Sequence, residues 1–500
     1  MKLFHKPASI DCHAHAGTVD ACCFLSLKTI LVMLFCMLTA TLFAQQGKAI
    51  QLEFPPTQYT TKLTQIPCDT NGLCVLYPSS ENEPFLLNIE HYNINLQPVH
   101  KTAFPIPTAH EYIGATYHNG IVYVLYQRKD KKKKDDNGLV LCYECRTQTL
   151  DTFFVANLPT VNNITRLTAH NHHLFFTCDL NKENENLYFL NITKKFAKAL
   201  YLNSSIRYTI NDYLIDSVYQ RVIICVNSAS HTRNNTLLMC ETDFEGNVQY
   251  AIPFPDTNEY RFQNARVEQM DSDKFFIGGT YQDRKITISN SATGMYTTIY
   301  DGGMFTHTNL IPYSGDTYHF DFYDRTETMF ISGKIYHDST RYAFITEAFY
   351  PEYRYSTTYS YGMPSTDAIF YGYHFQSAQV RIFDTTGTLT WAYDFPFDRN
   401  LVSNLSPHLK ISFLPNNVLF YYQFGQDLYT MLTDNDMEIV DPIRKSSFYP
   451  DEQYSNQTRY TSAFMKWYGP YYLLYGYRFA KRSNNKAKSP TYFLYKMKYQ

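Results

Sequence analysis

The densest group of histidines in the chain is His170-Asn171-His172-His173. Imidazole is a common ligand of zinc and other transition metals, so this group is a candidate metal site. It lies between Leu167 and the apolar Leu174-Phe175-Phe176, an arrangement typical of a polar hairpin tip between two strands. Because a metal site would need further ligands that the sequence does not place, we interpret the group as a turn.

Two charged stretches are candidate binding sites of other kinds. Asp434-Asn435-Asp436 and Glu438 offer oxygen ligands at alternating positions, but they lack the glycine and the twelfth-position glutamate of an EF-hand, which favours a solvated turn. The lysine run Lys129–Lys134 resembles a patch for a membrane or a nucleic acid. It is flanked by aspartates and contains no aromatic residue, so we predict a mobile, solvated loop.

Cysteines could provide either metal ligands or disulfides. The seven that follow the apolar N-terminal segment are Cys68, Cys74, Cys142, Cys145, Cys178, Cys225 and Cys240. An odd number with none beyond residue 240 argues against the disulfide framework of a small secreted scaffold. The best candidate pair is Cys68 with Cys74, across the Thr70-Asn71-Gly72 turn. Cys142 and Cys145 form a single C-x-x-C whose odd separation places them on opposite faces of a strand, which suits neither zinc nor a disulfide. We therefore interpret the cysteines as buried structural thiols.

Motifs of the common enzyme classes are missing from the sequence. It contains no G-x-S-x-G, no H-E-x-x-H, no Walker loop and no dinucleotide-binding glycine pattern. We assign no catalytic, cofactor-binding or metal-binding residue and expect no cofactor. The two carboxylates of a glycosidase would meet only in the folded protein, so a hydrolase remains an alternative.

The first 44 residues have the pattern of an N-terminal extension followed by a signal peptide. Lys28 precedes the apolar run Thr29–Ala44, and Ala44 is a small residue at the expected cleavage site before Gln45. The run is short for a membrane-spanning helix, although an uncleaved anchor stays an alternative. His13 and His15 precede the export signal, so we assign no chemistry to them. Residues 45–500 are predicted to form one exported domain.

A repeated strand–turn–strand unit organises that domain. In Gln379–Pro396, apolar residues alternate on both sides of a turn that contains Asp384 and Gly387. Cys240–Pro255 repeats the unit around Asp243 and Gly246. Similar hairpins are expected elsewhere, at Asn119-Gly120 and Asn416-Asn417 for example, and within 286–300 with a turn near Thr293-Gly294. The two aspartates lie 141 residues apart, which is three times 47.

Repeats of roughly 40–50 residues, each a small sheet, are the signature of a β-propeller. We predict an all-β fold, a propeller with seven or eight blades, and an outer-membrane β-barrel is the alternative. The composition agrees, since 45 tyrosines and a charged fraction of 18% suit half-buried strands. The formal net charge of −2 argues against a nucleic-acid partner. Stable membrane insertion is not expected.

The unit around Asp384, Gly387 and Trp391 resembles the D-x-x-G-x-x-x-W repeat of bacterial quinoprotein-like propellers. The resemblance implies that Trp391 docks one blade against the next, and the Cys240–Pro255 unit has Tyr250 in the tryptophan position. The chain also resembles the secreted, uncharacterised β-repeat proteins of Gram-negative bacteria, which implies no activity.

The functional prediction rests on the lack of catalytic motifs, on the repeat plan, and on the low charge with high tyrosine content of the chain. The segment Phe349–Tyr373 is the richest in tyrosine. Tyrosine rings on loops can make contact surfaces for proteins or glycans, but for this segment we favour aromatic packing between blades. We predict a non-catalytic binding or scaffolding module of the cell envelope, located in the periplasm, at the outer cell surface or outside the cell. The alternative is a propeller hydrolase acting on envelope or extracellular glycans, for which carboxylates with an arginine or histidine should converge at the axial channel.

Overall fold

A computed structural model describes residues 50–54, 63–78, 85–128, 137–159, 164–181, 184–202, 207–229, 235–285, 292–313, 320–321, 326–360, 363–425, 427–447, 458–480 and 491–499. Contacts divide the chain into two units, Met1–Ile50 and Gln51–Gln500. The predicted export segment (1–44) and the lysine loop (129–136) lie outside the described residues. The described sheets belong to the second unit, apart from Ile50, at which the first strand begins.

Short alternating segments of the sequence form antiparallel sheets, each built from consecutive strands. Blade 1 holds β2 (Thr64–Pro67), β3 (Leu73–Pro78), β4 (Phe85–Tyr92) and β5 (Pro98–Ile106), with the 3-10 turn η2 (Asp69–Asn71) between β2 and β3. Blade 2 holds β6 (His110–His118), β7 (Ile121–Arg128), β8 (Gly138–Glu144) and β9 (Thr149–Val155). Blade 3 holds β10 (Ile164–His170), β11 (His173–Asn181), β12 (Asn184–Asn191) and β13 (Phe196–Ala199). Blade 4 holds β14 (Arg207–Asp216), β15 (Arg221–Ala229), β16 (Asn235–Asp243) and β17 (Val248–Pro253).

The second half of the chain forms four more blades, some of which have longer or additional strands. Blade 5 holds β18 (Tyr260–Phe262), β19 (Arg266–Asp271), β20 (Lys274–Asp283), β21 (Gly294–Asp301) and β22 (Met304–Pro312), and the short pair β23 (Phe320–Asp321) and β24 (Thr326–Glu327) follows. Blade 6 holds β25 (Met329–Ser332), β26 (Tyr336–His337), β27 (Arg341–Ser360), β28 (Met363–Asp384) and β29 (Leu389–Val402). Blade 7 holds β30 (Lys410–Phe413), β31 (Asn417–Phe424), β32 (Asp427–Asp434) and β33 (Ile439–Ser447). Blade 8 holds β34 (Thr458–Lys466), β35 (Tyr471–Ala480), β36 (Thr491–Lys498) and, as its outer strand, β1 (Ile50–Phe54).

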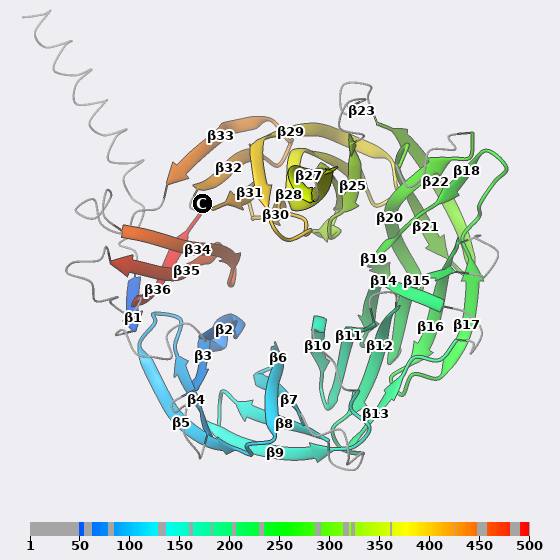
Figure 1. Cartoon of the computed structure of the whole chain (residues 1–500). Coiled ribbons are helices and arrows are strands. Elements are labelled where there is room, and N and C mark those ends of the chain that lie inside the picture. Colours follow the sequence, from blue (N-terminus) through cyan, green and yellow to red (C-terminus); the bar gives the residue numbers. More distant parts are fainter. Residues whose placement is uncertain are drawn as a thin grey trace, which may run out of the picture. The chain divides into compact units, whose positions relative to one another are not determined.

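The core lies between neighbouring sheets. Each hydrophobic cluster joins two consecutive blades, from Ile89 against Val124 in blades 1 and 2 to Leu473 of blade 8 against Val75 of blade 1. Alternate residues of a middle strand therefore face different neighbours, which explains why β3 is buried on both faces. Because the last sheet packs on the first, the series closes into a ring, with strands such as β2, β6, β10, β14 and β19 toward the centre (Figure 1).

This arrangement is an eight-bladed β-propeller in the part of the chain that is described. It confirms the first of the two folds predicted above. None of the described residues belong to a helix long and apolar enough to cross a membrane. The ring closes through side chains as well as through β1. The Trp467 indole Nε1 donates to the Gly72 carbonyl at 2.9 Å, and the Tyr492 hydroxyl donates to Gln65 Oε1 at 2.7 Å.

The repeated turn joins the third and fourth strands of a blade. The Asp243 carboxylate accepts the Glu245 and Asn247 backbone N–H groups at 3.0 and 2.8 Å, and Asp384 accepts those of Thr386 and Thr388 in the same way. Position four of each turn has a positive φ, 73° at Gly246 and 84° at Gly387, which glycine adopts without strain.

Two sequence-based details were wrong. The 141 residues between the aspartates span two blades and not three, because β18, the β23–β24 segment and the long β27–β28 strands lengthen this part of the chain. Gly294 does not form a hairpin tip either. It begins β21 and pairs with Tyr281 of β20.

Candidate functional site

The histidine group forms the hairpin turn that the sequence predicted, since β10 ends at His170 and β11 begins at His173. Their rings pack against aromatic neighbours, with His170 at 4.7 Å from His118 and 5.5 Å from Phe244 between ring centroids. Burial lowers the pKa of His118, His170 and His173. This stack of neutral rings joins blades 2, 3 and 4, which is a packing role.

Asp434–Glu438 is another copy of the repeated turn. The Asp434 carboxylate accepts the Glu438 backbone N–H at 2.8 Å, and Met437 takes the positive φ, 67°, that Gly246 and Gly387 take elsewhere. The carboxylate is thus used by the backbone, as in the other turns. The predicted turn is confirmed, and it shows that this feature of the repeat does not require glycine.

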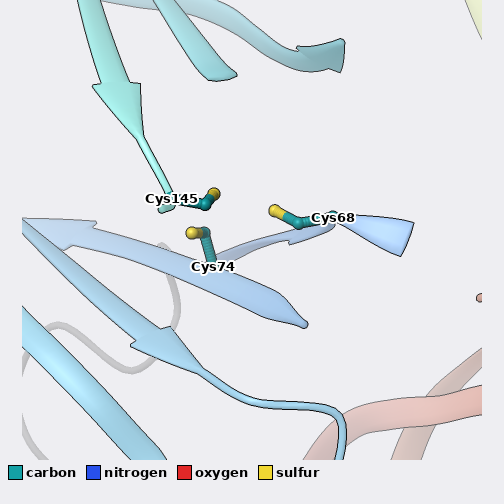
Figure 2. Close-up of side chains that lie close together, drawn as sticks. All are labelled: Cys68, Cys74 and Cys145. Atoms are coloured by element: carbon teal, nitrogen blue, oxygen red, sulfur yellow. The ribbon is translucent and has the colours of Figure 1, made fainter. Parts of the chain in front are cut away.

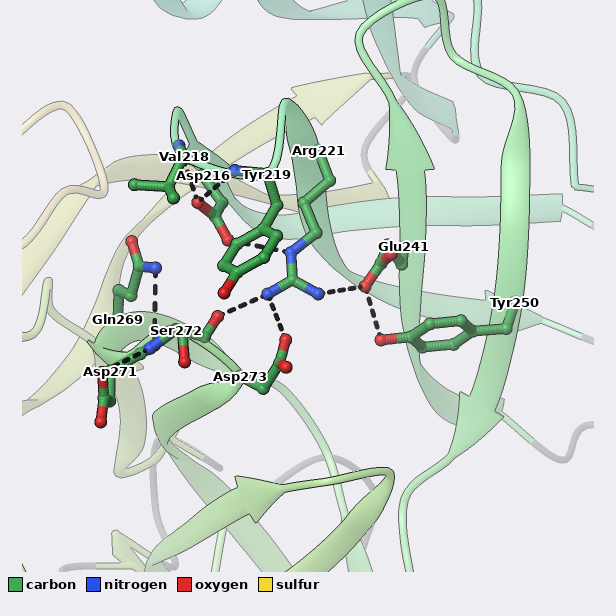
Figure 3. A network of polar contacts seen from close by, with 10 residues as sticks. All are labelled: Asp216, Val218, Tyr219, Arg221, Glu241, Tyr250, Gln269, Asp271, Ser272 and Asp273. Atoms are coloured by element: carbon green, nitrogen blue, oxygen red, sulfur yellow. Dashed lines mark hydrogen bonds and ion pairs between the residues drawn. The ribbon is translucent and has the colours of Figure 1, made fainter.

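A guanidinium group holds blades 4 and 5 together (Figure 3). Arg221 Nε contacts the fully buried Asp216 at 2.9 Å, and its Nη atoms reach Glu241 at 3.0 Å and Asp273 at 2.7 Å. A further bond reaches the Ser272 carbonyl at 2.5 Å. Burial lowers the pKa of Arg221, but its hydrogen bonds to Asp216 and Asp273 and the charges of Glu241 and Asp216 outweigh this effect and raise the pKa overall. Arg221 therefore has a structural role, because its ion pairs link blade 4 to blade 5.

The inner strands of blades 3 to 6 bring together charges from distant parts of the sequence. Arg166 of β10 pairs with Asp212 of β14, whose Oδ2 accepts the Val267 backbone N–H at 3.1 Å. On β19, Glu268 Oε1 lies 3.7 Å from His337 Nε2 of β26. Burial raises the pKa of Glu268, although the charges of His337 and Lys334 oppose the shift. Glu268 is thereby a candidate proton donor at the inner edge of the ring.

Three cysteines meet between blades 1 and 2 (Figure 2). The Sγ atoms of Cys68, Cys74 and Cys145 lie within 4.8 Å of one another, and all three side chains are buried and outside any disulfide. Sulfur hydrogen bonds from Cys68 and Cys74 lower the pKa of the Cys145 thiol. Cys142 faces the other way, into the cluster between blades 2 and 3, as the odd spacing predicted.

The sequence missed this cysteine trio. It suggested Cys68 with Cys74 alone, and it excluded zinc and a bridge at Cys142 and Cys145 because they face opposite sides of a strand. The prediction that Cys142 and Cys145 face opposite sides was correct. However, Cys145 meets two cysteines of the preceding blade, beside a turn more than 70 residues earlier in the sequence. Only packing between blades places those residues together, and no spacing in the chain signals it.

The tyrosine-rich segment forms a ribbon that extends blade 6. β27 and β28 pair from Arg341 with Asp384 as far as Ser360 with Met363, well beyond the lengths of neighbouring strands. Tyr373 packs on the buried Phe349 with ring centroids 5.7 Å apart, and so joins the ribbon to the core. Packing between blades, the interpretation that the sequence favoured, does not describe the outer tyrosines, because Tyr353 and Tyr355 are 43% and 58% exposed.

The two faces of the ribbon differ. Phe370 pairs with Tyr353 across the ladder and contacts Tyr373 at 4.9 Å between ring centroids, so that a row of aromatic rings runs outward along one face. On the other face the Arg354 guanidinium lies 3.4 Å over the Tyr371 ring, and the Glu352 carboxylate accepts a hydrogen bond from the His374 ring. Side chains of 358–366 lie outside the description, Tyr359 and Tyr361 among them.

Comparisons with known proteins complete the description. No model of a protein family matches the chain, and the search of curated proteins gave no match. Among solved structures, the polysaccharide lyase Uly1 matches with 9% identity and a TM-score of 0.41 over 77% of this chain and 89% of its own. An ulvan lyase of family PL25 matches with 10% identity and a TM-score of 0.39 over 76% and 90%. TolB from Acinetobacter baumannii matches with 9% identity and a TM-score of 0.29 over 73% and 80%. Nothing about activity or ligand follows from likenesses of this size.

Proposed function

We propose that the protein is an exported binding or scaffolding module of the cell envelope, and that the ribbon of blade 6 carries its contact surface. The observation that supports this is the exposed aromatic row of Tyr353, Tyr355 and Phe370. Exposed rings gathered on one extended element are unusual for a surface without a partner. The secreted β-repeat proteins that the sequence resembles fit the same proposal, with a mature chain beginning near Gln45.

The ribbon has the properties of a recognition element. Antiparallel pairing and the Tyr373 contact with Phe349 hold its base in one conformation, so that little side-chain freedom is lost when a partner binds. Tyrosine and phenylalanine supply flat apolar area, which suits the face of a sugar ring or an apolar protein patch. The charged groups on the opposite face, Arg354 and Glu352, already have partners within the ribbon.

Binding of the purified mature chain to an array of polysaccharides and to envelope protein extracts tests the proposal. We expect Tyr353→Ala and Phe370→Ala each to weaken binding by about 2 kcal/mol, roughly thirtyfold in Kd, as at interface hot spots. Tyr201→Ala is the matched control, since Tyr201 is 64% exposed outside the ribbon and should not affect binding. Equal affinity of the ribbon variants and the native chain would contradict the proposal.

A glycan hydrolase is the second candidate function. The inner-edge charges Asp212, Glu268 and His337 favour it, because a protonated carboxyl group beside a second carboxylate is the basis of glycoside hydrolysis. The same polysaccharide panel, assayed for new reducing ends, separates the two functions. Turnover that Glu268→Gln abolishes would establish the hydrolase. Binding without turnover supports the module.

A further inference from the structure

The three thiols between blades 1 and 2 occupy a position with the properties of a metal site. Cys68 and Cys74 flank the turn between β2 and β3, and Cys145 follows β8 of the next blade. Their Sγ atoms lie within 4.8 Å of one another. Zinc–sulfur bonds of about 2.3 Å in a tetrahedron need sulfurs about 3.8 Å apart, so small side-chain movements suffice.

A histidine beside the trio is oriented as metal-binding histidines are. His91 lies opposite Cys74 in the β3–β4 ladder, which puts both side chains on the same face of the sheet. Its Nε2 lies 2.7 Å from the Asn71 carbonyl oxygen, which can only accept, so Nε2 carries the proton. The lone pair is then on Nδ1, which lies 3.4 Å from the Tyr143 hydroxyl, a long contact that an ion would replace. The hydrogen bond from Nε2 to a backbone carbonyl fixes the ring as in zinc sites.

A polar pocket of about 390 Å³ borders the two cysteine segments and is lined by residues of both. Asn71 belongs to the turn between Cys68 and Cys74, and Glu144 and Arg146 are the immediate neighbours of Cys145. The trio lies within one hydrophobic cluster. Other buried thiols of the described chain, such as Cys225 and Cys240, are divided between the clusters of two different blade pairs.

We propose that Cys68, Cys74 and Cys145 bind a thiophilic d10 cation, Zn²⁺ being the probe, with Nδ1 of His91 as the fourth ligand. Each cysteine that binds releases its thiol proton to solvent, and no oxidation or reduction occurs. The ion joins blade 1 to blade 2 at one end of the chain. This site is independent of the ribbon and of the function proposed for it.

Zinc content of the untagged, exported chain, with Co²⁺ as a spectroscopic probe of the metal-free protein, tests the site. We expect about one zinc per chain and intense thiolate-to-cobalt absorption. Cys74→Ser and Cys145→Ser should lose the absorption, and His91→Ala should weaken zinc binding at least about tenfold. Cys142→Ser is the matched control and should bind like the native chain.

A second measurement keeps the test valid if a cysteine variant fails to fold. Alkylation of the native chain with and without Zn²⁺ should show zinc protecting the three thiols and leaving Cys142 unchanged. A chain that binds no zinc, a Cys142→Ser variant that loses it as Cys74→Ser does, or a mass showing a disulfide within the trio would overturn the proposal. Zinc binding unchanged in His91→Ala would overturn the assignment of the fourth ligand.

Discussion

At the scale of single residues, Glu347 shows how burial changes an ordinary side chain. It lies fully buried on β27, and its carboxyl group accepts the backbone N–H groups of His408 at 2.8 Å and Leu409 at 2.7 Å. The carboxyl thereby fixes the connection from blade 6 to blade 7. Burial raises the pKa of Glu347 to about 8, although the two N–H donors oppose the shift.

This shift predicts a loss of stability with rising pH. The native state holds the Glu347 proton from about pH 4 to about pH 8, where the unfolded chain has released it, so the free energy of unfolding falls across that window by up to about 1.4 kcal/mol per unit. Glu347→Gln keeps an acceptor for the N–H groups and removes this slope. Urea unfolding of both proteins across the window measures the difference.

The neighbouring histidine does not obscure this measurement. Burial lowers the pKa of His408 to about 4. His408 therefore makes the free energy of unfolding rise with pH, and it does so equally in the native protein and in Glu347→Gln. Glu259→Gln, at an exposed position, should leave the native slope unchanged. Parallel curves for the native protein and Glu347→Gln would show that Glu347 is ionised in the fold.

At the scale of elements, the Asp-x-x-Gly turns of blades 4 and 6 pack against the preceding blade. A Cβ atom at Gly246 would lie 2.6 Å from the buried Phe189 ring of blade 3. Gly246→Ala should therefore cost about 1 kcal/mol for the positive φ and about 2 kcal/mol for overpacking against a rigid ring. Denaturant unfolding measures both costs together.

A second glycine separates the two costs. Gly302 also has a positive φ, 55°, but no atom lies within 4 Å of the place that its Cβ would take. Gly302→Ala should show the conformational cost of about 1 kcal/mol alone. If Gly246→Ala and Gly302→Ala lowered the free energy of unfolding equally, the Gly246 turn would not be packed tightly against blade 3.

At the scale of the whole molecule, closure of the ring depends on contacts between the two ends of the chain. Trp467 is buried, and its indole N–H reaches the Gly72 carbonyl at 2.9 Å. Trp467→Phe removes this hydrogen bond and part of the volume of the side chain, so we expect the free energy of unfolding to fall by about 1–3 kcal/mol. Limited proteolysis should then cut first near β1 and β36, because those strands belong to the weakened blade.

Trp391 is the matched comparison for that prediction. It stacks on Phe420 of blade 7 with ring centroids 5.4 Å apart, as the resemblance to quinoprotein-like repeats implied. Trp391→Phe keeps the stacking and should cost less than 1 kcal/mol. The prediction would be contradicted if Trp391→Phe lowered the free energy of unfolding as much as Trp467→Phe does, and if Trp467→Phe did not increase proteolysis near β1. The contact between the two ends of the chain would then contribute no more to stability than any other contact between blades.

The sequence by itself determined the class of the fold and the local turns. Alternation of apolar residues is a property of neighbours along the chain, so the strands, the hairpin at His170–His173 and the turns at Asp243 and Asp384 followed from it. Even the opposite faces of Cys142 and Cys145 followed, because a strand has a period of two.

Tertiary structure alone decided which residues meet. Cys145 reaches Cys68, Glu268 reaches His337, and Trp467 reaches Gly72 only because blades pack side by side and the ring closes. Insertions such as the long β27–β28 strands also shift the repeat, and alternation along a strand does not predict which blades become neighbours. The same packing turned the tyrosines of Phe349–Tyr373 outward on a ribbon, a choice that the composition of the segment left open.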